Sequence, residues 1–271
     1  MVSHRKLRAA AVVCAVVVVA GPAPVAAWAA PATAPATAPV AAPTAPAPSP
    51  DPFAGLTAGQ IADRAIAATR SATSLRMAGR VVTGGQPLDI DFAIDGRGQC
   101  DGTMRIKGGL AELRRTDGAT YLKGDEGFWH ASMASQGMSP AQIAATVELV
   151  KGRWLKITPG QAGSGDLGGV CDLSALLGGG TAQRRALTRG PDTEVGGVPA
   201  ATLVARGQGG TTTTLSVALE GRPYLLRMTK TGGGSPGTLV FSAYGKPVHV
   251  AVPPASQTVD LARLEQGATP A

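Results

Sequence analysis

Residues 88–95 read Leu-Asp-Ile-Asp-Phe-Ala-Ile-Asp, and this stretch decides the fold class of the chain. Its apolar residues occupy every second position and therefore share one face of a β-strand: Leu88, Ile90, Phe92 and Ile94. The opposite face carries three acids: Asp89, Asp91 and Asp95. One apolar face and one charged face are typical of a strand in an antiparallel sheet that is covered on a single side.

The same alternation continues on both sides of this strand, with glycine-rich turns between the segments. We expect strands at 75–82, 103–107, 111–116, 120–124, 184–189, 198–206, 212–219, 223–230, 237–244 and 248–252, and a short extended piece at 153–157. Helices are expected at 57–74, from Ser139 onward and at 172–177, with a short helix or tail at 257–266. The pattern predicts one α+β domain that spans residues 53–266, followed by a tail at 267–271.

Two of these helices carry a sequence signature at their first residues. Thr57 and Ser139 can each cap a helix, and Gln60 and Gln142 follow three residues later, which completes a capping box in both cases. Apolar residues then recur at helical spacing, so we expect each helix to pack one face on the sheet.

The N-terminus has the anatomy of a secretory signal peptide. A basic stretch at 5–8 precedes an apolar run at 9–20, and small residues then lead to an A-x-A motif at 27–29. The run is shorter than the roughly 20 apolar residues that a membrane-spanning helix needs. We expect residues 1–29 to be removed on export, and retention of the run as an uncleaved anchor is the alternative.

A Pro/Ala/Thr-rich linker follows at residues 30–52. Proline fixes φ and removes backbone donors, so this composition favours an extended spacer and does not form a core. The alternative is that its threonines, Thr33, Thr37 and Thr44, accept O-linked sugars. Either interpretation places the domain outside the cytoplasm, secreted or held in the cell envelope.

The net positive charge of the chain does not by itself predict a nucleic-acid partner. The net charge is +7 for 271 residues, and three of these positive charges belong to the expected signal peptide. The densest basic pairs, Arg114-Arg115 and Arg184-Arg185, are far apart in the sequence. Nucleic-acid binding needs a clustered basic face, usually with stacking aromatic residues, so solvated strands and loops are the better interpretation.

Two cysteines remain after the signal peptide, Cys100 and Cys171, and an oxidising compartment favours a disulfide between them. A metal pair or a reactive thiol is the alternative. However, the sequence has no C-x-x-C, and the only histidines after the signal peptide, His130 and His249, are not at ligand spacing. We therefore expect no metal site and no cofactor.

No catalytic motif was found, so we expect a protein that is not an enzyme. The sequence lacks a G-x-S-x-G elbow, an H-E-x-x-H pair, an S-x-x-K motif and a phosphate-binding glycine loop. We place His130 at a strand end after Phe128-Trp129, and His249 inside the strand 248–252. The acids on the strand 88–95 either bind a cation or face solvent, and solvent is favoured because Ca²⁺ needs ligands from a curled loop.

The order of these segments resembles the LolA-like half-barrel, in particular the LppX/LprG-type envelope lipoproteins. The likeness rests on a capped helix leading into residues 74–79, the strand that begins at Leu88, and the phrase 120–124 with Trp129 shortly after it. It implies a strongly curved antiparallel sheet of about 10–11 strands whose concave face is covered by helices. The chain departs from the lipoproteins because Val13 precedes Cys14, which gives no lipobox.

The resemblance implies an exported envelope protein that binds or carries a hydrophobic ligand, a lipid or its acyl chains, in an apolar cavity. The candidate lining residues are Leu75, Met77, Leu88, Ile90, Phe92, Ile94, Met104, Ile106, Leu226, Met228, Leu239 and Phe241. A solid core would give the same sequence pattern. The alternative function is a non-catalytic interaction or sensory module displayed on the Pro/Ala spacer, in contact with the membrane surface or with wall polymer.

Overall fold

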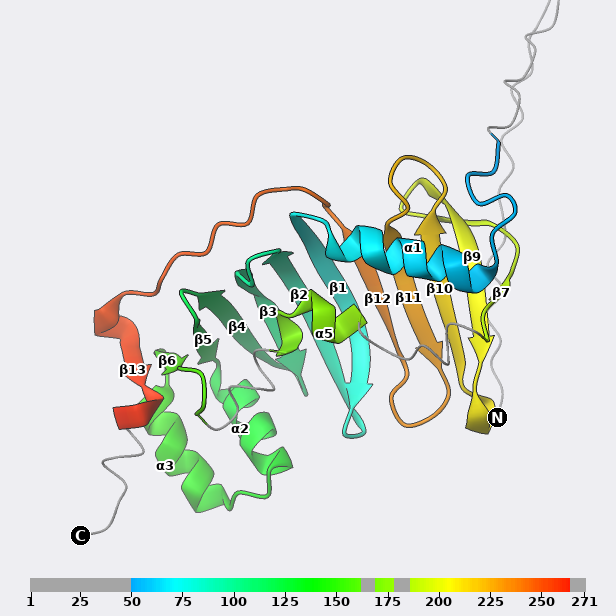
Figure 1. Ribbon diagram of the computed structural model, residues 1–271. Coiled ribbons are helices and arrows are strands. Elements are labelled where there is room, and N and C mark those ends of the chain that lie inside the picture. Colours follow the sequence, from blue (N-terminus) through cyan, green and yellow to red (C-terminus); the bar gives the residue numbers. More distant parts are fainter. Residues whose placement is uncertain (1–49, 162–168, 178–185, 264–271) are drawn as a thin grey trace, which may run out of the picture. The chain divides into compact units, whose positions relative to one another are not determined.

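The computed structural model describes residues 50–161, 169–177 and 186–263. These residues form one large, unclosed and curved sheet with helices over its concave face (Figure 1). The predicted α+β half-barrel is confirmed, with 13 strands in the described part of the chain rather than ten or eleven.

The helices are α1 (Ala58–Arg70), α2 (Glu126–Ser135), α3 (Pro140–Val150) and α5 (Leu173–Leu177). The strands are β1 (Ser74–Thr83), β2 (Gln86–Asp95), β3 (Cys100–Ile106), β4 (Gly109–Thr116), β5 (Ala119–Gly124), β6 (Trp154–Ile157), β7 (Thr188–Arg189), β8 (Thr193–Val195), β9 (Val198–Arg206), β10 (Thr212–Ala218), β11 (Leu225–Thr231), β12 (Gly237–Ser242) and β13 (Thr258–Asp260).

The strands follow the order β13-β6-β5-β4-β3-β2-β1-β12-β11-β10-β9-β7, and β8 pairs with β9. Neighbours are antiparallel except β13, which lies parallel to β6. The two halves of the chain meet at β1 and β12, where Met77 lies opposite Phe241. The strand that decided the fold class, β2, therefore lies near the middle of the sheet.

Both predicted capping boxes are present. In α1 the backbone N–H of Gln60 donates to Thr57 Oγ1 over 3.3 Å, and the Thr57 N–H donates to Gln60 Oε1 over 2.9 Å. Ser139 and Gln142 make the same reciprocal pair at the start of α3. The first helix ends at Arg70 rather than at residue 74, because Ser74 already belongs to β1.

The segment around His130 is a helix, so its placement at a strand end was wrong. Asp125 caps α2, and its carboxylate accepts the backbone N–H of Phe128 over 2.7 Å. The helix lies directly on the start of β4, where a Cβ at Gly109 would be 2.0 Å from the Phe128 nitrogen. Only glycine allows this close approach, because any larger residue would push α2 away from the sheet.

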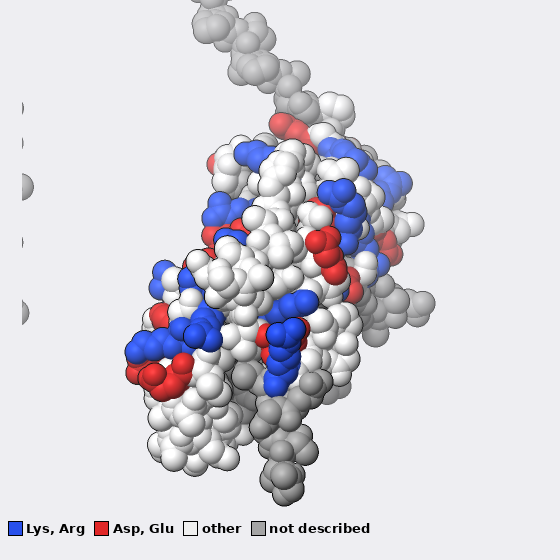
Figure 2. Space-filling model, turned by 90° about the vertical axis from the view of Figure 1, so that its left-hand side faces the viewer, with Lys and Arg blue, Asp and Glu red and all other residues white. Residues whose placement is uncertain are grey.

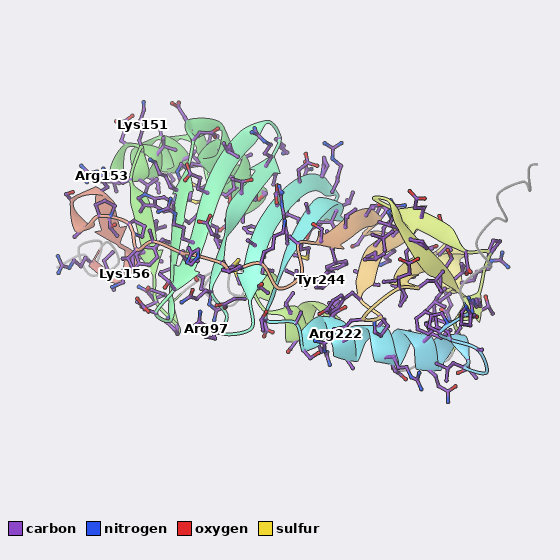
Figure 3. The ribbon with its side chains drawn as sticks, turned by 90° about the horizontal axis from the view of Figure 1, so that it is seen from above. Arg97, Lys151, Arg153, Lys156, Arg222 and Tyr244 are labelled. Atoms are coloured by element: carbon purple, nitrogen blue, oxygen red, sulfur yellow. A yellow bond between two sulfur atoms is a disulfide. The ribbon has the colours of Figure 1, made fainter. Side chains whose placement is uncertain are left out.

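The predicted strand at 248–252 was also wrong. Residues 245–257 form an irregular connection, the strap, which runs from the end of β12 to β13 and ends in a short 3-10 helix at Ala255–Gln257 (Figures 1 and 3). The three prolines of the strap, Pro247, Pro253 and Pro254, have no N–H to donate, which makes this segment a poor partner in a ladder. His249 is exposed on it.

The main core lies between the sheet and its helices. The fully buried side chains include Ile61 of α1, Phe92 of β2, Leu113 of β4 and Leu203 of β9. A smaller cluster lies on the convex face around Ala200. None of the helices that the structure describes has the length and apolar character needed to span a bilayer.

Candidate functional site

The concave face between α1 and α2 consists of cross-strand rows of side chains, which follow from the register of the ladders. The upper row is sealed from water, with Phe241, Met77 and Phe92 exposed by only 0 to 2 %. The candidates Leu75 and Ile94 lie opposite each other above it and are just as buried. Here the sheet and the helices pack closely, as in an ordinary protein core.

The middle row is slightly more open. Leu239, Ile90 and Met104 are exposed by 6 to 9 %, and they lie in register across β12, β2 and β3. Between Leu239 and Ile90 the row contains Gly79, whose Cβ would lie 2.0 Å from the carbonyl oxygen of Thr238. The glycine lets β12 lie against β1 and contributes no side chain to the row.

The lower row reaches solvent. Val81, Leu88 and Ile106 lie in register across β1, β2 and β3, and each is half-buried. Met228 of β11, at the end of the middle row, is half-buried as well. All four contact the main core on one side. We call these four side chains, Val81, Leu88, Ile106 and Met228, the open lane.

Two of the described helices, α1 and α2, flank this region, and α5 lies in front of the middle of the sheet (Figure 1). In Figure 1, α1 crosses the upper part of β10 and β11, and α2 lies at the lower ends of β3, β4 and β5. The hairpins β1–β2, β9–β10 and β11–β12 all turn at the lower edge of the sheet in that view. The open lane lies just above these turns. An apolar surface that grades from sealed to exposed in this way is a candidate site for an apolar ligand.

Eleven of the twelve candidate lining residues belong to the main core or pack against it. The exception is Leu226, which lies in the separate cluster on the convex face. A register shift in the β10–β11 ladder, where Val217 pairs with Leu225, explains its position. The extra residue reverses the alternation, so Leu225 rather than Leu226 faces α1, where its N–H donates to Thr69 Oγ1 over 3.0 Å.

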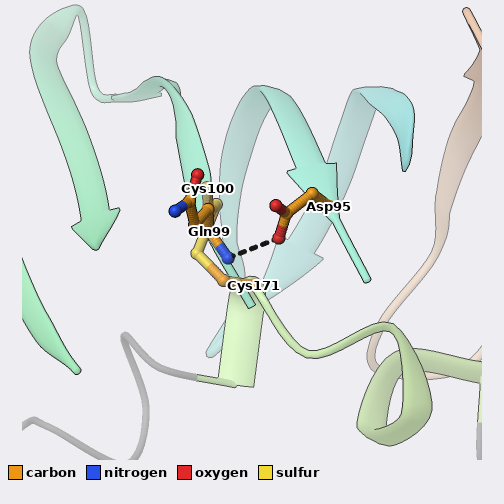
Figure 4. The surroundings of a disulfide bond; sticks show 4 residues. All are labelled: Asp95, Gln99, Cys100 and Cys171. Carbon is orange, nitrogen blue, oxygen red and sulfur yellow. Dashed lines mark hydrogen bonds between the residues drawn. A yellow bond between two sulfur atoms is a disulfide. The ribbon is translucent and has the colours of Figure 1, made fainter. Parts of the chain in front are cut away.

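The predicted disulfide is present between Cys100 and Cys171, with 5.7 Å between the Cα atoms (Figure 4). It ties the start of β3 to the segment that leads into α5. Beside it, Asp95 closes the β2–β3 turn by accepting the N–H groups of Arg97 and Gln99 over 2.9 and 2.8 Å. Asp95 is therefore a buried turn residue and does not share the solvated face of the other two acids.

Asp89 and Asp91 pair with arginines of the neighbouring strand. Arg80 Nη2 donates to Asp89 over 2.7 Å, and Arg76 Nε donates to Asp91 over 2.6 Å. These hydrogen bonds from the guanidinium groups hold the pKa of both carboxyls below its ordinary value. In the part of the chain that the structure describes, no three His, Cys, Asp or Glu side chains gather as metal ligands.

A cleft of about 790 Å³ lies between the strap and the β2–β3 turn. Its lining includes Ser74, Asp95, Arg97 and His249. In Figure 3 the strap passes between the labelled positions of Tyr244 and Lys156, with Arg97 beside it. Ser74 Oγ fixes the first part of the strap by donating to the carbonyl of Lys246 over 2.5 Å.

Charged side chains are mixed on the end of the sheet that carries α3 and β13. Figure 2 shows basic and acidic groups side by side on this face. Lys151 lies 3.7 Å from Glu126, and Lys156 lies 4.0 Å from Asp260. Such paired charges form no single-signed surface on the face shown.

Comparison with known proteins gives structural neighbours only, because no family model and no curated protein matches the sequence. LprF from Mycobacterium bovis is 16 % identical, with a TM-score of 0.48 over 72 % of this chain and 96 % of that one. The lipoprotein LppX from Mycobacterium tuberculosis is 16 % identical, with a TM-score of 0.44 over 71 % of this chain and 97 % of that one.

A third neighbour is a putative outer membrane lipoprotein-sorting protein domain from Vibrio parahaemolyticus. It is 11 % identical, with a TM-score of 0.21 over 71 % of this chain and 94 % of that one. At these identities the likeness concerns the fold alone. At the level of the fold the chain resembles LppX-type lipoproteins and a LolA-like lipoprotein-sorting domain, as its sequence predicted.

Proposed function

We propose that the chain is an exported envelope protein that binds a hydrophobic ligand, a lipid or its acyl chains, on the concave face of its sheet. The observation that supports the proposal is the gradient of burial across the three rows, which ends in the open lane. Val81, Leu88 and Ile106 lie in register and Met228 lies in the next row, so the covered face keeps four half-exposed apolar side chains beside its core. The open lane is the contact surface for the ligand.

The ligand lies on the lane rather than in a sealed cavity. The upper row is fully packed, so it forms the rigid back wall of the site. Each 100 Å² of apolar surface that is hidden from water contributes about 2.5 kcal/mol. A long acyl chain can therefore be held along the lane without any specific hydrogen bond, which agrees with the apolar character of the lane.

The experiment is a titration of the purified chain with cis-parinaric acid, a fluorescent fatty acid. The variants Leu88→Gln and Met228→Gln each add a polar group to the lane. We expect each to weaken binding by about 1 kcal/mol, or roughly fivefold. Thermal melts of both variants establish that the fold is intact.

The matched control is Leu149→Gln, because Leu149 is 53 % exposed on the outer side of α3 and lies outside the lane. We expect this variant to bind as the unmodified chain does. The proposal fails if the unmodified chain does not bind the probe, or if all three variants bind it equally well.

A further inference from the structure

A small cleft of about 280 Å³ lies beside the β9–β10 hairpin, and its described lining includes Arg206, Lys230, Thr211 and Thr213. Thr213 lies opposite Lys230 on the concave face, whereas Arg206 lies opposite Thr212 on the other face of the sheet. No Asp or Glu is among the described residues that line the cleft. The cleft therefore combines positive charge with hydrogen-bond donors.

The cleft is continuous with the lane in the register of the sheet. Lys230 follows Met228 at the spacing that keeps both on the concave face, and it lies opposite Gly237 in the β11–β12 ladder. Gly237 in turn lies opposite Val81, and Val81 lies opposite Leu88. Since Gly237 has no side chain, nothing in this row separates Lys230 from the first apolar residue of the lane.

Lys230 lacks the partner that other cations of the sheet have. Arg76 and Arg80 on the convex face each form a bidentate pair with an aspartate of β2. Within the described residues, Lys230 forms no ion pair. An unneutralised cation in a partly enclosed cleft attracts an anion more strongly than the same charge would on an open surface.

We infer that the ligand is a single-chain amphiphile with an anionic head group, whose head binds at Lys230 and whose chain lies along the open lane. This inference rests on the proposed function and specifies the class of its ligand. From β11 to β3 the lane crosses four strand spacings, roughly 19 Å, which suits one long acyl chain. A carboxylate and a phosphate share the required chemistry, because each accepts charge-assisted hydrogen bonds from the Lys230 ammonium group.

The test compares three single-chain ligands below their micelle concentrations by isothermal titration calorimetry: stearate, stearoyl lysophosphatidate and uncharged octadecanol. We expect at least one of the two anions to bind about tenfold more tightly than octadecanol, because its head group gains charge-assisted hydrogen bonds. The tighter of the two anions identifies the head group as a carboxylate or a phosphate. Added salt should weaken the binding of the anions and not that of octadecanol.

The variant Lys230→Gln examines the head-group site, and it should reduce the advantage of the anions and leave octadecanol binding unchanged. Arg206→Gln changes a neighbouring cation on the other face of the sheet and should have little effect. Lys246→Gln is the matched control, since Lys246 is an exposed lysine of the strap, and it should change nothing. Equal binding of all three ligands, with no effect of Lys230→Gln, would overturn the head-group inference.

The outcomes separate this inference from the proposed function. If octadecanol and the anions bind equally and Met228→Gln weakens all three, the lane binds acyl chains and only the head-group site is wrong. If none of the three ligands binds the unmodified chain, the proposed function itself is wrong.

Discussion

Two arginine–aspartate pairs link β1 to β2 on the convex face of the sheet. In the pair Arg76–Asp91 the side chains are 55 % and 39 % exposed, so water screens much of the attraction between them. The geometry is bidentate, which fixes the relative position of the two strands as well as adding energy. Between β1 and β2 the convex face is thus held by paired charges, whereas the concave face of these two strands is apolar.

The ion pair makes the free energy of unfolding depend on pH through the ionisation of Asp91. Arg76 holds the pKa of Asp91 below its ordinary value of 3.8, so the pair stabilises the fold above the unfolded pKa, and the contribution is lost as the pH falls through the folded pKa. We expect Asp91→Asn to lower the free energy of unfolding at pH 7 by about 0.5 kcal/mol. Urea denaturation measures the difference.

At about pH 2.5 the difference between Asp91→Asn and the unmodified chain should be smaller than at pH 7, because the contribution fades as the pH falls toward and through the lowered pKa of Asp91. Glu220→Gln, in the exposed β10–β11 turn, is the control and should be neutral at both pH values. A deficit of equal size at pH 7 and at pH 2.5 would show that the charge of Asp91 is not what stabilises the fold.

At the scale of elements, the disulfide attaches α5 to the sheet. Both sulfur-bearing side chains are buried, and the bond closes a loop with a sequence separation of 71. A loop of this length loses much of its conformational freedom in the unfolded state when it is closed. The bond therefore stabilises the segment that covers the middle of the concave face.

We expect the double variant Cys100→Ala, Cys171→Ala to lower the free energy of unfolding by about 4 kcal/mol. Chemical denaturation of the variant and of the unmodified chain measures this loss. The unmodified chain treated with a reductant should fall to the level of the variant. Two free thiols in the untreated, denatured chain, or a variant as stable as the parent, would contradict the assignment.

The elements that the sequence predicted well are those whose local signals agree with their surroundings. The capping boxes at Thr57 and Ser139 located α1 and α3, and strict alternation located β2. The helix α2 was missed because Gly127 and the aromatic residues after it favour other conformations. Asp125 was the available signal, since it is a good N-cap.

Alternation alone could not locate the whole candidate site. It placed eleven of the twelve lining residues on the correct face and failed at Leu226, because a β-bulge is a tertiary feature that adds one residue to a strand. Val81 and Lys230 have the same spacing as their neighbours on β1 and β11 and could have been added. Which rows are sealed and which reach solvent depends on where the helices lie, and the sequence does not encode that locally.

At the scale of the whole molecule, the described domain combines a tightly packed upper half of the concave face with an open lower edge. The packed rows stabilise the sheet, and the open lane leaves apolar surface accessible to a ligand. With a ligand on the open lane, as we propose, this one sheet is both the scaffold of the domain and its binding surface.

The most direct test of this account is methyl NMR of the chain with spin-labelled stearate. We predict that the methyl signals of the open lane, from Val81, Leu88, Ile106 and Met228, broaden on addition of the ligand and recover when ascorbate reduces the spin label. The signals of Val198, Val252 and Leu149, which are exposed elsewhere, should stay sharp. No broadening, or broadening that spares the lane, would contradict the account.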